Sequence, residues 1–146
     1  MTCYKQIQLT NNAFGAIAAD AYMPYGRVTR RINAPTNCSN TFTVGSSTAD
    51  TVTINEPGFY KVTYSVTAIA NAEGIVTVEL VTNGASVYTV STTATADATV
   101  NLTLPYTIRV LPNSDSAPNN VPVAIQIQNT GVALTSGTSN LIIEKI

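Results

Sequence analysis

Residues 59–69 alternate strictly between two kinds of side chain, which limits what this chain can fold into. One set of alternate positions is apolar or aromatic: Tyr60, Val62, Tyr64, Val66 and Ala68. The positions between them are polar: Lys61, Thr63, Ser65 and Thr67. Side chains of a β-strand point alternately to opposite faces, so this pattern predicts a strand with one core face and one polar face.

Alternation of this kind recurs along the chain, with turn residues between the segments. Further strands are expected at residues 51–54, 75–82, 86–90, 98–104, 106–111, 121–128 and 140–146. Asn83-Gly84 predicts a hairpin turn because both residues can take a positive φ, and Pro105 is expected to end the strand before it. Only residues 12–21 show a weak helical pattern. We therefore predict an all-β antiparallel sandwich or barrel.

The types of residue present exclude several classes of function. A net charge of −1 with seven basic residues argues against a nucleic-acid partner, and the chain has no histidine and only two cysteines. No apolar stretch is long enough to cross a membrane as a helix. The eight acidic residues are scattered without an accompanying base or nucleophile. We therefore expect no enzyme activity, no cofactor and no metal site.

Charge divides the chain into two parts. In residues 1–35 four bases against one acid give +3, whereas in residues 36–146 three bases against seven acids give −4. We therefore expect an N-terminal anchoring or docking segment at residues 1–35, which extends away from a globular domain at residues 36–146. The docking residues expected in that segment are Lys5, Arg27, Arg30 and Arg31.

Two local features of the N-terminal part each have two interpretations. The arginines at 27, 30 and 31 either pair with carboxylates of an acidic protein surface or discourage aggregation at a polar strand edge. Cys3 and Cys38 are expected to be free thiols, because the first residues lack the pattern of a secretory signal and cytoplasmic disulfides seldom persist. If oxidised instead, these cysteines would tie the N-terminal segment to the globular domain.

The residues from 54 to 66 carry a family resemblance. Their sequence, with Pro57-Gly58-Phe59-Tyr60 leading into the long alternating strand, resembles the jelly rolls of the tumour-necrosis-factor-like and complement-globular-head proteins. The later order is similar too, from the valine-rich strand before Asn83-Gly84 to the apolar strand at residues 141–146. The resemblance covers about residues 41–146 and is greatest to the bacterial and phage branch, although no collagen-like stalk precedes it.

This resemblance implies a TNF-like antiparallel jelly-roll sandwich that assembles as a tight homotrimer. Tyr60 and Tyr64 are expected in the core or at the trimer interface, because each has an apolar ring with a polar tip. Ile142 and Ile146 are expected on the strand face opposite Leu141, so one of the two faces must be covered by something outside the first sheet. An obligate interface of about 2,000–5,000 Å² could cover it.

Resemblance and composition together suggest a structural protein of a bacteriophage virion, made in the host cytoplasm. We expect a trimeric capsid decoration or head-fibre protein that contacts itself and, through residues 1–35, the capsid. The first alternative is a receptor- or carbohydrate-binding fibre tip, with exposed aromatics or a polar groove in loops such as residues 112–120 or 70–74. The second is a small glycan-degrading enzyme, which would need two acids within about 5–10 Å.

Overall fold

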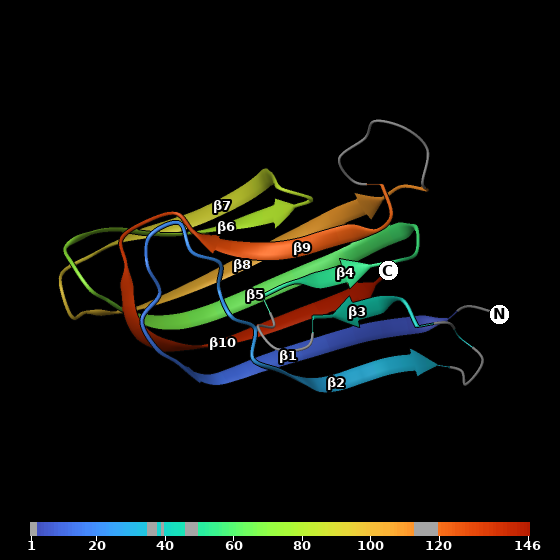
Figure 1. The fold of residues 1–146 in the computed structure, drawn as a ribbon, viewed down its shortest axis with the longest axis horizontal. Coiled ribbons are helices and arrows are strands. Elements are labelled where there is room, and N and C mark those ends of the chain that lie inside the picture. Colours follow the sequence, from blue (N-terminus) through green and yellow to red (C-terminus); the bar gives the residue numbers. More distant parts are fainter. Residues whose placement is uncertain (1–2, 35–37, 39, 46–49, 113–119) are drawn as a thin grey trace.

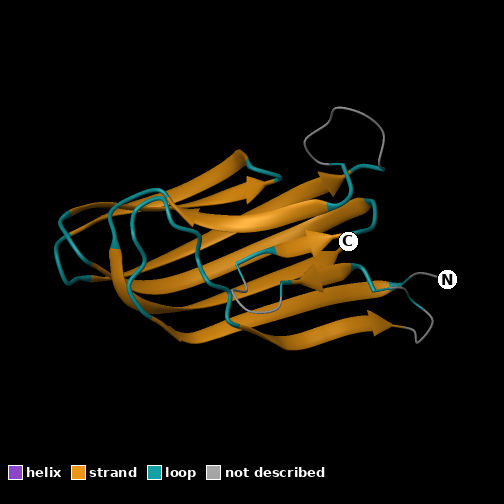
Figure 2. Cartoon of the chain, in the orientation of Figure 1, coloured by secondary structure: helices purple, strands orange, loops and turns teal. Residues whose placement is uncertain are grey.

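The computed structural model describes residues 3–34, 38, 40–45, 50–112 and 120–146, and these contain ten strands and no helix. The strands form two layers (Figures 1 and 2). The strand bounds are β1 Tyr4–Phe14, β2 Arg27–Ala34, β3 Phe42–Val44, β4 Val52–Ile54, β5 Gly58–Ala70, β6 Gly74–Thr82, β7 Ala85–Ala94, β8 Thr99–Val110, β9 Val123–Asn129 and β10 Leu134–Lys145.

The two layers are five-stranded sheets whose strand order alternates between distant parts of the chain. Sheet A has the order β2-β1-β10-β5-β8, and sheet B has the order β3-β4-β9-β6-β7. Every pairing between these strands is antiparallel. The architecture is therefore the predicted jelly-roll sandwich. Because the first and last strands are neighbours in sheet A, the start of β1 and the end of β10 lie at the same end of the molecule (Figure 1).

The hydrophobic core fills the space between the sheets. Sheet A supplies the predicted face of β5, and the side chains of Tyr60, Val62 and Tyr64 are fully buried. Sheet B supplies alternate residues of β6 and β9, among them Leu80 and Ile125. The alternation of residues 59–69 therefore predicted the core face of β5 correctly.

Two predictions about chain breaks have different outcomes. Asn83 and Gly84 have φ values of 48° and 81° and form the turn between β6 and β7, as predicted. Pro105, in contrast, does not end a strand, because β8 continues through it from residue 99 to residue 110. Proline is tolerated in β8 because this strand lies at the edge of sheet A and pairs only with β5.

The expected separation of residues 1–35 from the globular domain is wrong. β1 lies between β2 and β10 in sheet A, and its Ile7 and Leu9 are fully buried in the shared core. The residues expected to be weakly helical instead end β1 and pass through an isolated bridge between Ile17 and Leu134. Met23 and Tyr25 then also enter the core, where the Tyr25 hydroxyl donates a 2.9 Å hydrogen bond to the Ile125 carbonyl. Residues 4–34 are thus part of the sandwich.

Candidate assembly and docking surfaces

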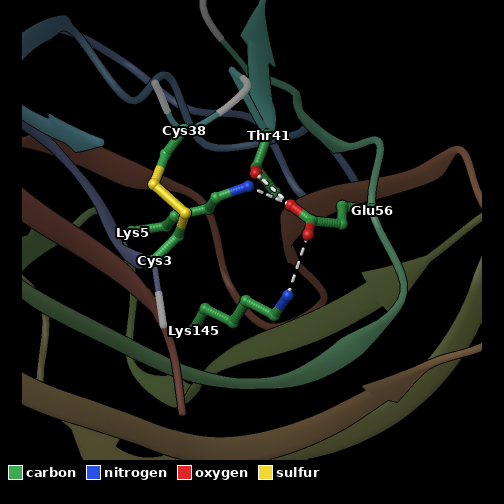
Figure 3. Close-up of a disulfide and its surroundings, with 6 residues drawn as sticks. All are labelled: Cys3, Lys5, Cys38, Thr41, Glu56 and Lys145. Carbon is green, nitrogen blue, oxygen red and sulfur yellow. Dashed lines mark hydrogen bonds and ion pairs between the residues drawn. A yellow bond between two sulfur atoms is a disulfide. The ribbon is translucent and has the colours of Figure 1, made fainter. Parts of the chain in front are cut away.

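Glu56, in the turn between β4 and β5, holds three other parts of the chain together (Figure 3). Its Oε2 accepts hydrogen bonds from the Lys5 ammonium and, at 2.7 Å, from the Thr41 hydroxyl. Its Oε1 accepts a 3.0 Å hydrogen bond from the Lys145 ammonium. We call these four residues the Glu56 clasp. Because Lys5 and Lys145 belong to sheet A and Thr41 immediately precedes β3 of sheet B, the clasp joins the two sheets.

The clasp keeps the carboxylate charged. Burial by itself would raise the pKa of Glu56, but the hydrogen bonds from Lys5, Thr41 and Lys145 outweigh it and lower that pKa to about 2. Lys5 is only 1% exposed, so its ammonium depends on Glu56 for a counter-charge. The predicted docking role of Lys5 is therefore wrong, since no partner can reach a side chain that is buried inside the sandwich.

The two cysteines lie beside the clasp and form a disulfide (Figure 3). The Cα atoms of Cys3 and Cys38 are 5.9 Å apart, which is within the range that a disulfide requires. The expectation of free thiols is therefore wrong. The bond closes a loop with a sequence separation of 35 residues, which contains β1 and β2.

The three predicted docking arginines lie on β2, the edge strand of sheet A, but they differ in surroundings. Arg31 donates 3.0 Å hydrogen bonds to the Asn40 side chain and the Phe42 carbonyl, so it joins β2 to β3. Arg27 and Arg30 are exposed and form no hydrogen bond or ion pair with any residue that the structure describes. The structure thus leaves two of the four predicted docking residues available to a partner.

The four residues expected in the core or at a trimer interface divide into two pairs. Tyr60 and Tyr64 are fully buried in the core. Ile142 is half-buried and Ile146 is 73% exposed, and both lie on the outer face of sheet A. Sequence reasoning missed Phe59, although its place in the alternating strand puts it on the same outer face as Lys61.

Exposed apolar side chains lie side by side where β1, β5 and β10 meet at one end of sheet A. Tyr4, Phe59 and Ile146 are 45%, 53% and 73% exposed, and we call them the outer apolar patch. The Ile146 amide donates a 2.9 Å hydrogen bond to the Phe59 carbonyl, and the Arg109 guanidinium lies 5.8 Å from the centre of the Phe59 ring. Adjacent exposed apolar residues of this kind commonly mark an interaction surface.

A second candidate surface is the side of the sandwich where the edge strands β7 and β8 meet. Tyr88 of β7 stacks on Tyr106 of β8 with ring centroids 5.4 Å apart. The ten residues of β7 include no charged residue and no proline. We call this strand the β7 edge. Among the described strands its backbone hydrogen bonds only with β6, and its other side lies towards β8 without pairing with it, so the backbone groups there can still pair with another chain.

The surroundings of the other predicted sites are less informative. Residues 113–119, most of the loop proposed for carbohydrate binding, lie outside the described residues. Near the turn at residues 70–74 there is a groove of about 320 Å³. No aromatic residue is among those that line it: Glu73, Gly74, Ile75, Thr93, Ala94 and Thr95. In the described part of the chain, no three histidine, cysteine or acidic residues are placed to hold a metal ion, and no helix could span a membrane.

Comparisons with known proteins identify the fold. No family model matches the chain, and no curated protein sequence matches it. Solved structures do match. The match to the Eiger TNF of S. frugiperda has a TM-score of 0.71 and 10% identity, and it covers 99% of this chain and 94% of the Eiger chain. The protein has a TNF-like jelly-roll fold.

Two further structures extend this likeness. The globular domain of zebrafish complement 1qA protein has a TM-score of 0.61 and 9% identity over 94% of each chain. The match to the PRD1 vertex protein P5 has a TM-score of 0.54 and 17% identity, and it covers 99% of this chain and 97% of the P5 chain. The TNF-like fold is thus shared with a phage structural protein as well as with animal proteins. At these identities the likeness concerns the fold alone.

Acid should remove the stabilisation that the Glu56 clasp provides. The pKa of Glu56 falls from 4.5 to about 2 on folding, so this stabilisation is complete above about pH 4.5 and is lost as the pH falls towards 2. Urea unfolding should therefore show that Glu56→Gln lowers the free energy of unfolding most at neutral pH, by about 1–3 kcal/mol, because the buried Lys5 ammonium loses its carboxylate while the one-third exposure of Glu56 allows water to screen part of the interaction. The difference from the unmodified protein should narrow at pH 2.

The matched control removes both charges. Lys5→Met combined with Glu56→Gln removes the fully buried ammonium and leaves only the partly exposed Lys145 without its carboxylate, so it should recover most of the stability that Glu56→Gln alone loses. Equal losses in the single and double variants would show that Lys5 does not depend on Glu56.

Reduction should destabilise the protein without changing its fold. Closing a loop of 35 residues stabilises a folded chain by about 3–4 kcal/mol through the entropy of the unfolded state. Replacing Cys3 and Cys38 with serine should produce the same loss in urea unfolding as adding a reductant to the unmodified protein. A reductant that leaves the midpoint of the unmodified protein unchanged would contradict the disulfide.

Proposed function

We propose that the protein is a non-enzymatic structural protein of a bacteriophage particle, where it forms a homotrimer on the capsid as a decoration or head-fibre protein. The outer apolar patch carries this proposal, because the single chain leaves it exposed to water. The TNF-like fold is typical of trimeric proteins, and its occurrence in the PRD1 vertex protein supports a role in a virion.

The two candidate surfaces fit contacts between identical chains. A ring forms when one surface of each copy meets a different surface of the next, and three copies close it if the rotation is threefold. The β7 edge is uncharged, and so are the positions of sheet A nearest Ile142 on its outer face, such as Gln8, Thr63 and Pro105. Contact between the β7 edge and this uncharged row would gain about 25 cal/mol for each Å² of apolar area buried. The outer apolar patch beside the row brings Arg109 and Glu144 to the margin of the contact.

The remaining attachment is to the capsid and runs through β2. Arg27 and Arg30 are available there, whereas Lys5 and Arg31 serve the fold itself. Because β2 and β7 are the edges of different sheets, one copy can contact its neighbours and the capsid through separate strands.

The oligomeric state tests the first part of this proposal. Light scattering on the full chain should give three times the monomer mass of 15.3 kDa. Replacing Phe59 and Ile146 with aspartate should shift the protein to the monomer, because charges placed in an apolar contact lose their hydration. Tyr22→Asp is the control, since Tyr22 is 38% exposed and lies beside Gln128 of β9, two strands away from β7, so it should leave the trimer intact. A stable monomer of the unmodified protein would contradict the proposal.

The location of the protein tests the second part. Antibodies raised against the chain should label the outside of the phage particles whose genome encodes it, at symmetric positions in electron micrographs. The protein should also remain with those particles through density-gradient purification. Its complete separation from intact particles would show that it is not a virion component.

A further inference from the structure

Most basic side chains of the protein have a partner within it, but Arg27 and Arg30 of β2 form no hydrogen bond or ion pair with the described residues. Lys5 and Lys145 bind Glu56, Arg31 binds Asn40 and Phe42, and Arg109 lies over Phe59. Lys61, Arg27 and Arg30 form no hydrogen bond or ion pair with any residue that the structure describes, and of these three only Arg27 and Arg30 lie on the same strand.

Both arginines lie on the outer face of an edge strand. Arg30 is opposite Gln8 and Arg27 is opposite Thr10, and these two residues alternate with the buried Ile7 and Leu9. The pairing shifts by one residue between Gln8 and Leu9, so the two arginines share a face although three positions separate them. Their spacing along β2 therefore matches that of residues two apart in a regular strand, about 7 Å.

A shallow hollow, lined mainly by carbon atoms of small and polar residues, adjoins Arg27. It has a volume of about 390 Å³ and contains one charged side chain together with hydroxyl and amide groups. The lining residues are Thr10, Asn11, Asn12, Ala13, Gly26 and Arg27. Gly26 is required here because its φ is +80° and a Cβ would lie 2.3 Å from the Thr10 carbonyl oxygen.

Protection of the edge against aggregation explains the arginines less well. Charged residues often blunt exposed edge strands. Yet the β7 edge is longer than β2, and it carries no charge and no proline. Protection by charge requires no fixed spacing, whereas the register shift places both arginines on one face of β2 at the spacing of alternate residues. The arginines therefore fit a partner of opposite charge better than a general protective role.

We propose that the docking partner of β2 is an extended acidic segment of another particle protein, which pairs with β2 as an added strand. Two of its carboxylates, at positions two residues apart, form bidentate contacts with Arg27 and Arg30. Backbone hydrogen bonds along the free side of β2 supply the rest of the affinity. This inference rests on the proposed function, because it names the chemistry of the partner that the virion role requires.

A synthetic peptide tests the inference on the full-length, oxidised protein. The probe has eight residues, with glutamate at two alternate positions and threonine or valine elsewhere. One comparison peptide places the same glutamates three positions apart, on opposite faces of a strand, and another has lysine in place of glutamate. Isothermal titration should detect only the first peptide, and its affinity should fall as salt is raised.

Protein variants identify the contact. Arg27→Gln with Arg30→Gln should weaken binding of the first peptide at least tenfold. Ala72→Asp with Ala96→Asp changes the net charge by the same amount at exposed turns away from β2, and should leave binding unchanged. Hydrogen exchange should show new protection of the β2 amides when the peptide is bound, because an added strand engages the backbone.

Several outcomes would overturn the inference. These are absence of binding, equal binding of all three peptides, or binding without protection of the β2 amides. Tighter binding of a single-stranded oligonucleotide with the same number of charges would indicate nucleic acid as the partner and also exclude the acidic strand. A trimer that fails to bind the peptide refutes this inference alone, whereas a monomer that still binds it refutes the proposed trimer alone.

Discussion

The buried positive charge of Lys5 needs a counter-charge, and Glu56 supplies it at the end of the sandwich where β1 begins and β10 ends. The ammonium group of Lys5 lies inside the protein, so a carboxylate must be held against it, and Glu56 meets this need from the turn before β5. The same carboxylate also binds Thr41 and Lys145, which ties the neighbouring strands β1 and β10 of sheet A to the start of sheet B. β1, which carries Lys5, is also held in place by its backbone pairing with β10 and β2.

The sequence predicted the regular parts of the fold because their signals are local. Alternation along β5 and the Asn83-Gly84 turn each depend on a few adjacent residues. The same alternation is present in β1, where Lys5, Ile7 and Leu9 take every second position, but charge asymmetry suggested a detached segment instead. The clasp could not be predicted, because Glu56 is 51 positions from Lys5 and 89 positions from Lys145, and the three meet only through sheet topology.

The four edge strands of the sandwich differ in a way that suits separate contacts. β3 has only three residues, and β8, although long, contains Pro105 and Arg109, which disfavour pairing with another strand. β2 carries Arg27 and Arg30, which form no hydrogen bond or ion pair with the described residues, whereas β7 is long and uncharged. One charged and one neutral edge would allow a chain to distinguish an acidic partner from copies of itself. Binding an acidic strand at the neutral edge, or a neutral strand at the charged edge, would remove water from charges that have no partner there.

The bond between Cys3 and Cys38 has a mechanical consequence for attachment. It closes a covalent loop that contains β1 and β2, and the disulfide that closes the loop lies next to the buried Lys5. Under tension, a strand with a free end can separate from its neighbour one hydrogen bond at a time. A strand inside a disulfide-closed loop can separate only until the disulfide carries the load. Force on β2 therefore passes through the disulfide to the start of β1, in the middle of sheet A.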